Sequence, residues 1–75
     1  MESDQVKPGL RVKVTHIGKT TGMIIHQKHL RVRRKGITGT VTSYVPGHGG
    51  DVWFVKHDEA DVIGAYVFTE LEPTT

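Results

Sequence analysis

Hydrophobic and polar side chains alternate along several stretches of this 75-residue chain. In residues 10–17, Leu10, Val12 and Val14 fall on one face, and charged or polar side chains stand between them. A period of two residues is typical of a β-strand that buries one of its faces. The first stretch therefore predicts a half-buried strand over residues 10–17.

A predicted β-hairpin at residues 36–58 is the centre of the pattern. Its strands, residues 37–45 and 51–57, are rich in β-branched and aromatic residues, and they flank a glycine-rich turn at residues 46–50. The residues expected to face inward are Ile37, Gly39, Val41, Ser43 and Val45 in the first strand, and Trp53, Val55 and His57 in the second. A glycine inside a strand, as at position 39, predicts a bulge, a sharp bend or a close backbone approach.

The C-terminal part of the chain continues the β pattern. Residues 62–68 predict a fourth strand, and residues 69–72 predict a tight turn or 3₁₀ step followed by a short closing strand. No segment has the apolar repeat of 3.6 residues that marks a surface helix. The expected fold is all-β, a small barrel of about five short strands. We expect one domain, with a disordered N-terminus at residues 1–5 and the barrel at residues 6–73.

The connection over residues 18–29 is the least regular part of the sequence. Residues 18–22 predict a loop, and the apolar residues 23–25 predict either a strand or a plug beneath that loop. A connection of this length indicates a functional loop or a segment with structure of its own. Beyond it, apolar residues alternate with arginines over residues 30–34, which predicts an extended arm that leads into the hairpin.

Three sets of residues resemble motifs of the SH3-like barrel superfold. Pro8-Gly9-x-x-Val12-x-Val14 resembles the opening of many such barrels, and Gly36-x-x-Gly39-Thr40-Val41 resembles the glycine-turn-strand signature of KOW-type barrels. The order of Trp53-x-Val55-x-His57-Asp58, Tyr66 and Glu70-Leu71-Glu72-Pro73 is similar to the C-terminal barrel of nitrile hydratase β subunits. Electron-transport accessory proteins share the superfold. The likeness covers about residues 6–73 and implies an SH3-like barrel. It implies no metal chemistry, because the nitrile hydratase metal lies in a Cys-rich motif of the other subunit.

The composition indicates the cellular compartment in which such a barrel is expected. The chain has no cysteine, which excludes disulfides and thiolate metal sites. It also lacks an apolar run long enough to span a membrane, and residues 1–4 do not resemble a signal peptide. These features predict a cytoplasmic protein.

The net charge of +2 conceals a strong asymmetry along the chain. Residues 5–50 contain nine Lys or Arg and no acid, whereas residues 51–75 contain six acids and one Lys. The two halves form either a basic face or, once folded side by side, neutralising ion pairs.

Residues 28–35 form a basic tract with five Lys or Arg in eight positions. Such a tract can follow a phosphate backbone, and Tyr44 or Phe54 could stack on a base. The alternative is an arm whose charges face water or pair with Asp58, Glu59 and Asp61.

Other candidate chemistry is weaker. His26 and His29 could bind a metal if His16, His48 or His57 supplied a third ligand, but one such pair falls short of a zinc site. We expect no metal and no cofactor. The turn at residues 46–50 offers backbone amides to an anion but lacks the Lys-Ser/Thr of a phosphate loop. No nucleophile elbow or catalytic triad is recognisable, so we expect no enzymatic activity.

The sequence therefore predicts a non-catalytic interaction or accessory module that docks a protein partner or a larger complex. The residues expected to make the contact are Arg31, Arg33, Arg34, Lys35, Tyr44 and Phe54. The alternative is a KOW-like module that binds RNA or the ribosome through the tract at residues 28–35.

Overall fold

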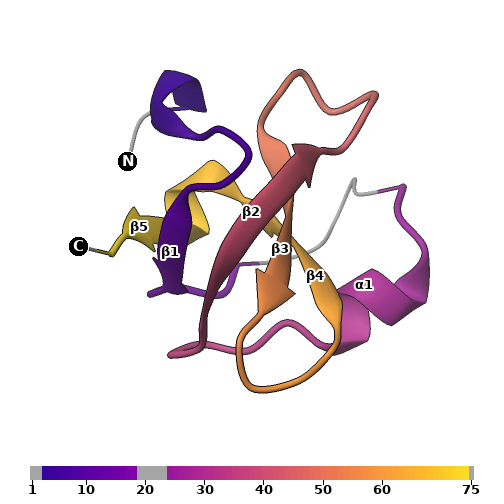
Figure 1. Cartoon of the computed structure of the whole chain (residues 1–75). Coiled ribbons are helices and arrows are strands. Elements are labelled where there is room, and N and C mark those ends of the chain that lie inside the picture. Colours follow the sequence, from indigo (N-terminus) through magenta and orange to yellow (C-terminus); the bar gives the residue numbers. More distant parts are fainter. Residues whose placement is uncertain (1–2, 19–23, 75) are drawn as a thin grey trace.

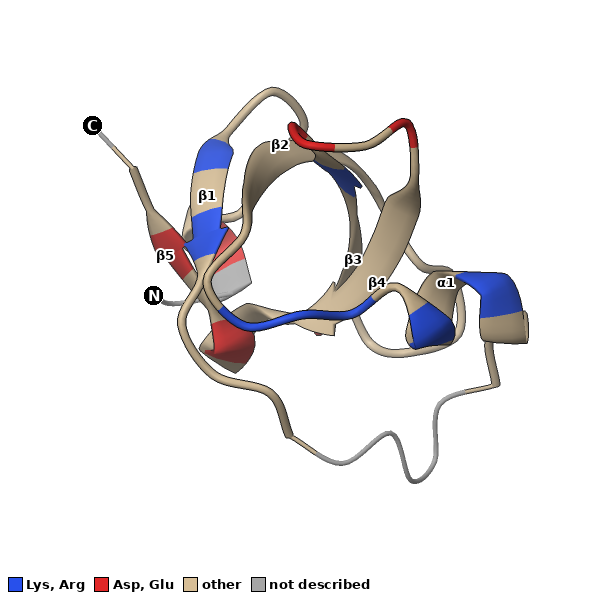
Figure 2. Cartoon of the chain, turned by 90° about the horizontal axis from the view of Figure 1, so that it is seen from below, with Lys and Arg blue, Asp and Glu red and all other residues tan. Residues whose placement is uncertain are grey.

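The computed structural model describes residues 3–18 and 24–74 and contains five antiparallel strands in one sheet. The strands are β1 (Arg11–Val14), β2 (Thr38–Tyr44), β3 (Val52–His57), β4 (Ile63–Val67) and β5 (Leu71–Pro73). The short helices are η1 (Ser3–Gln5), α1 (Gln27–Arg31) and η2 (Phe68–Glu70). The strand order is β4-β3-β2-β1-β5, and the sheet curves into a small barrel (Figures 1 and 2). The expected all-β fold is confirmed.

The interior of the barrel is a cluster of apolar side chains from strands far apart in the sequence. Val12, Val41, Val55 and Leu71 are each at most 1% exposed and pack in the same cluster. The predicted inward residues Val12, Val41 and Val55 therefore meet one another. Tyr66 of β4 lies in this cluster with no exposed surface, although it carries a polar hydroxyl.

Gly39 allows β2 and β3 to approach closely inside the barrel. A Cβ atom at this position would lie 2.3 Å from the backbone oxygen of Lys56 and 2.8 Å from a methyl carbon of Val55. Such contacts are too short for any side chain larger than hydrogen. The predicted close backbone approach is confirmed.

A β-bulge changes which residues of β2 face the interior. The register between β2 and β3 shifts between Val41 and Ser43, so Thr42 is the extra residue. Beyond the bulge the alternation is inverted, because a slip of one residue moves every side chain to the other face. Val45 accordingly packs in a second cluster with Val52 and not in the barrel interior. The prediction that the inward face of β2 continues to Val45 was wrong for this reason.

The second cluster lies on the outer surface of β3 and β4, beneath the segment that contains α1. Ile25 and Leu30 pack against its buried members, Val45, Val52 and Ala65. Figure 1 shows α1 beside β4. Residues 24 and 25 form no strand, and only Ile25 packs inward, since Ile24 is 92% exposed. Met23 and most of the loop at residues 18–22 lie outside the described residues.

The start of the basic tract is helical, so the prediction of an extended arm over residues 30–34 was wrong for residues 30 and 31. The helix has only five residues, too few to show an apolar repeat in the sequence. His26 caps its first turn, since the Nδ1 atom accepts a hydrogen bond of 3.1 Å from the Lys28 amide. In the part of the chain that the structure describes, no helix has the length and apolar character needed to cross a membrane.

Candidate binding groove

Two adjoining cavities lie between the segment 28–34 and the segment 57–63. The first, of about 360 Å³, is lined by Lys28, His29, Val32, Asp61, Val62 and Ile63. The second, of about 310 Å³, is lined by Arg31, Val32, Arg33, Arg34, His57, Ala60 and Val62. Because Val32 and Val62 line both, we treat the two cavities as one groove. Its first end is mainly apolar, and its second end is cationic.

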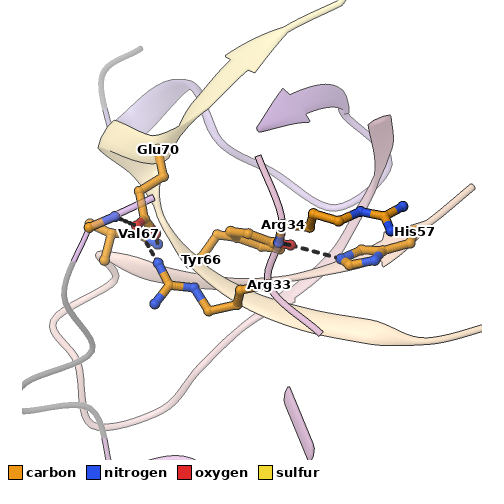
Figure 3. A network of polar contacts seen from close by, with 7 residues as sticks. Arg33, Arg34, His57, Tyr66, Val67 and Glu70 are labelled. Carbon is orange, nitrogen blue, oxygen red and sulfur yellow. Dashed lines mark hydrogen bonds and ion pairs between the residues drawn. The ribbon is translucent and has the colours of Figure 1, made fainter. Parts of the chain in front are cut away.

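A polar network fixes the wall of the cationic end against the barrel (Figure 3). The backbone amide of Arg34 donates a hydrogen bond of 3.1 Å to the hydroxyl of Tyr66. That hydroxyl lies 2.9 Å from Nε2 of His57. Since the hydroxyl accepts from the amide, its own proton is free to bond Nε2 of a neutral imidazole. The network ties the arm after α1 to strands β3 and β4.

Arg33 anchors the same arm through a buried ion pair with Glu70. Both side chains are 3% exposed. Glu70 also accepts hydrogen bonds from the Val67 amide (2.8 Å) and the Gly18 amide (2.5 Å). The guanidinium carbon of Arg33 lies 5.5 Å from the centre of the Tyr66 ring, within the range of a cation–π contact. Its Nε and Nη1 atoms are buried and have no hydrogen-bond acceptor among the described residues.

The electrostatics at the cationic end disfavour a second positive charge. Burial, followed by the field of Arg34, lowers the pKa of His57, while Glu59 acts weakly in the opposite direction. Burial raises the pKa of Tyr66, which keeps its hydroxyl protonated. The lowered pKa favours the neutral form of His57 at physiological pH.

Acids of the second half of the chain neutralise some bases of the first half but not all. Arg34 pairs with Glu59 at 2.5 Å, and both side chains are more than 60% exposed. Arg11 binds Asp58 through two hydrogen bonds, one of them 2.7 Å long. With the Arg33 pair, this confirms the expectation of ion pairs between the halves.

Lys28, Arg31 and Lys35 form no ion pair with any acid that the structure describes. The side chain of Arg31 donates a hydrogen bond of 3.0 Å to the amide oxygen of Gln27. The basic tract is thus divided into a part that is paired with carboxylates and a part that is not. Arg33 and Arg34 are engaged with carboxylates, and the three other cations remain uncompensated.

The apolar end of the groove is shaped by His29. Its Nδ1–H donates a hydrogen bond of 2.8 Å to the backbone oxygen of Ile63, which holds α1 against the start of β4. Its ring packs on Phe54, with 4.8 Å between the ring centres. Asp61 stands at this end as the one acid of its lining.

Of the residues predicted as contacts, the structure brings Arg31, Arg33 and Arg34 together around one cavity. Lys35 is exposed beyond the end of the groove. The two aromatic residues are separated, because Phe54 packs outside the barrel whereas Tyr44 lies against Trp53, at 6.0 Å between ring centres. The bulge in β2 is the cause of this separation, because it inverts the alternation after Val41.

The remaining candidates have local roles. His26 and His29 each use Nδ1 for a backbone hydrogen bond. The described part of the chain contains no group of three or more His, Cys, Asp or Glu placed to hold a metal ion. The turn at residues 46–50 closes the β2–β3 hairpin, and Gly47, Gly49 and Gly50 adopt positive φ.

Sequence reasoning did not identify the second wall of the groove. Ala60, Val62 and Ile63 belong to a turn and the start of a strand, and nothing in their order signals a binding role. They become a wall only because β4 brings them opposite α1.

Comparison of the chain with protein-family models, curated proteins and solved structures found no match. The assignment of a function therefore rests on the geometry of the groove.

Proposed function

We propose that the chain is a non-catalytic, cytoplasmic protein-interaction module built on an SH3-like barrel, and that the groove binds a short segment of a partner. The supporting observation is the pairing of an apolar cavity with a cationic one along one groove. A segment that places an apolar side chain next to an acidic one complements both ends.

The expected affinity of such a contact is modest. Burial of one large aliphatic side chain contributes about 1.5–3 kcal/mol. Each partly exposed ion pair adds about 0.2–1 kcal/mol. After the ordering of the segment is subtracted, the dissociation constant should be about 1 mM or weaker. The module is therefore suited to a transient contact or to one site of a larger assembly.

RNA binding by residues 28–35 is the alternative function. The pairing of Arg33 and Arg34 with Glu70 and Glu59 reduces the charge that the tract can offer to a phosphate backbone. Phosphate contacts release counterions, so RNA binding would weaken steeply as salt rises. A contact with a large apolar component should change much less.

The two functions are separated by a titration of ¹⁵N-labelled protein. The probe is an acetylated leucine–glutamate–glutamate peptide amide, and the controls are its glycine–glutamate–glutamate and leucine–lysine–lysine counterparts. We expect amide shift changes at Val32, Val62 and Ile63 with the first peptide only. Arg31→Glu should weaken binding by about threefold to tenfold, the effect of one or two exposed ion pairs. Lys13→Glu, an exposed cation on β1, is the matched control and should leave binding unchanged.

Three outcomes would overturn the proposal. The first is equal binding of the three peptides. The second is shift changes located away from the groove. The third is an absence of peptide binding together with salt-sensitive binding of mixed RNA oligomers to residues 28–35, which would establish the alternative.

A further inference from the structure

We propose that the cationic end of the groove is an oxyanion site that accepts one phosphoryl group, such as that of a phosphorylated side chain. The inference rests on the proposed function, because it specifies the acidic group that the partner presents. The cavity is lined by three arginines and His57, and the lining has no Asp or Glu among the residues described.

The charge at this end is left positive by the ion pairs within the protein. Three arginines line the cavity, and two of them are paired, Arg33 with Glu70 and Arg34 with Glu59. With His57 neutral, three cations and two carboxylates leave a net charge of +1. An anion bound here would therefore neutralise an existing excess of positive charge.

Arg33 supplies a fixed part of this field. Glu70 binds only one of its terminal nitrogens, and the buried Nε and Nη1 have no acceptor in the described segments. Buried donors are normally satisfied, whereas Nε and Nη1 are two N–H groups that still lack an acceptor among the described residues, although Glu70 balances the net charge of the guanidinium. Because the side chain is removed from water, this charge is weakly screened.

Arg31 and Arg34 are the mobile ligands of the proposed site. Arg31 is exposed and donates only to the neutral amide of Gln27 among the contacts described. Arg34 is 67% exposed, and its pair with Glu59 is of the weak surface kind. Both guanidinium groups can therefore turn to an incoming anion and bind two of its oxygens at once.

His57 provides a directional donor. Its Nε2 faces the hydroxyl of Tyr66, so the neutral ring that accepts this hydrogen bond carries its proton on Nδ1. In the proposed site this Nδ1–H donates to an oxygen of the ligand, since His57 lines the cavity. The charged groups that act on His57 are Arg34 and Glu59. A bound anion would oppose the effect of Arg34 and raise the pKa of His57.

The number and geometry of these donors favour a phosphoryl group over a carboxylate. A phosphate monoester carries a charge of about −1.5 to −2 near neutral pH and has three acceptor oxygens. A carboxylate carries a single charge and has two oxygens. Two guanidinium groups and one imidazole N–H match the larger set.

The test is a titration of the whole chain, at constant ionic strength, with O-phosphoserine, inorganic phosphate and acetate in turn. We expect saturable amide shift changes over residues 31–34 with the two phosphate compounds and none with acetate. The pKa of His57, measured from its ring proton resonances, should rise on saturation. Arg31→Gln and Arg34→Gln should each weaken binding by about threefold to tenfold. Lys13→Gln, outside the groove, should have no effect.

The outcomes separate the possible sources of the phosphoryl group. Tighter binding of O-phosphoserine than of inorganic phosphate supports a phosphorylated partner, whereas equal binding supports a site for free phosphate. Non-saturable shifts, shifts of equal size in the Arg31 and Arg34 variants, or equal binding of acetate would overturn the proposal. If phosphate fails while the acidic peptide still binds the groove, the oxyanion site is wrong and the protein-interaction function stands.

Discussion

Removing the carboxylate of Glu70 should destabilise the whole domain, because the buried guanidinium of Arg33 then loses its counter-charge. The Glu70→Gln side chain has almost the same shape but only one acceptor oxygen. In the native protein the carboxylate serves Arg33 and the amides of Val67 and Gly18. Glutamine cannot accept from all three donors, and its own amide hydrogens would face one of them.

The expected cost follows from the burial of the pair. Both side chains are 3% exposed, and breaking a buried pair on one side costs about 3–5 kcal/mol. A domain of this size has a total stability of roughly 4–11 kcal/mol. Glu70→Gln should therefore remove about half of the stability, and the protein should unfold at much lower urea concentration.

Urea denaturation followed by the fluorescence of Trp53, the single tryptophan, measures this loss. Two variants serve as controls. Glu59→Gln breaks the exposed pair with Arg34 and should cost less than about 1 kcal/mol. The double variant Arg33→Met/Glu70→Gln removes the buried cation as well and should regain part of the lost stability. The reasoning is refuted if Glu70→Gln costs no more than Glu59→Gln, or if the double variant is as unstable as the single one.

Three further predictions test the barrel and its charges. Gly39→Ala should destabilise the fold by roughly 1–3 kcal/mol, because the new methyl group meets the backbone of β3; a calorimetric melting temperature equal to that of the parent would contradict this. Burial and Arg34 lower the pKa of His57 in the folded protein. As the pH falls, the His57 imidazole is therefore protonated in the unfolded chain before it is protonated in the folded one. The contribution of His57 to the free energy of unfolding is thus full above about pH 6.5 and is lost as the pH falls below that value. Urea midpoints at pH 7.5 and 5.5 should differ, and His57→Asn should reduce the difference. The guanidinium of Arg11, followed by the hydroxyl of Thr38, lowers the pKa of Asp58 to about 2. In Arg11→Met this pKa should rise toward 3.8, as read from the carboxyl carbon resonance, and an unchanged value would disprove the assignment.

The sequence by itself determined the class of fold and most of the barrel interior. Alternation places Val12, Val41 and Val55 on inward faces, because successive side chains along a strand point to opposite faces of the sheet. Turn residues and glycines are local signals as well, which is why the hairpin turn and the close approach at Gly39 were predictable. The charge asymmetry between the halves made ion pairs between them a reasonable expectation, but it could not say which bases would stay free.

Only the tertiary structure decided the features from which the groove is built. The bulge at Thr42 depends on how β2 pairs with β3, and no property of the residue itself marks it. The helix α1 is held in place because Leu30, with Ile25 just before the helix, packs on the second cluster, whose members come from three different strands or their ends. The groove exists because β4 brings Val62 opposite Val32. Each of these depends on contacts between residues distant in the chain, and a pattern of neighbouring residues contains no information about such contacts.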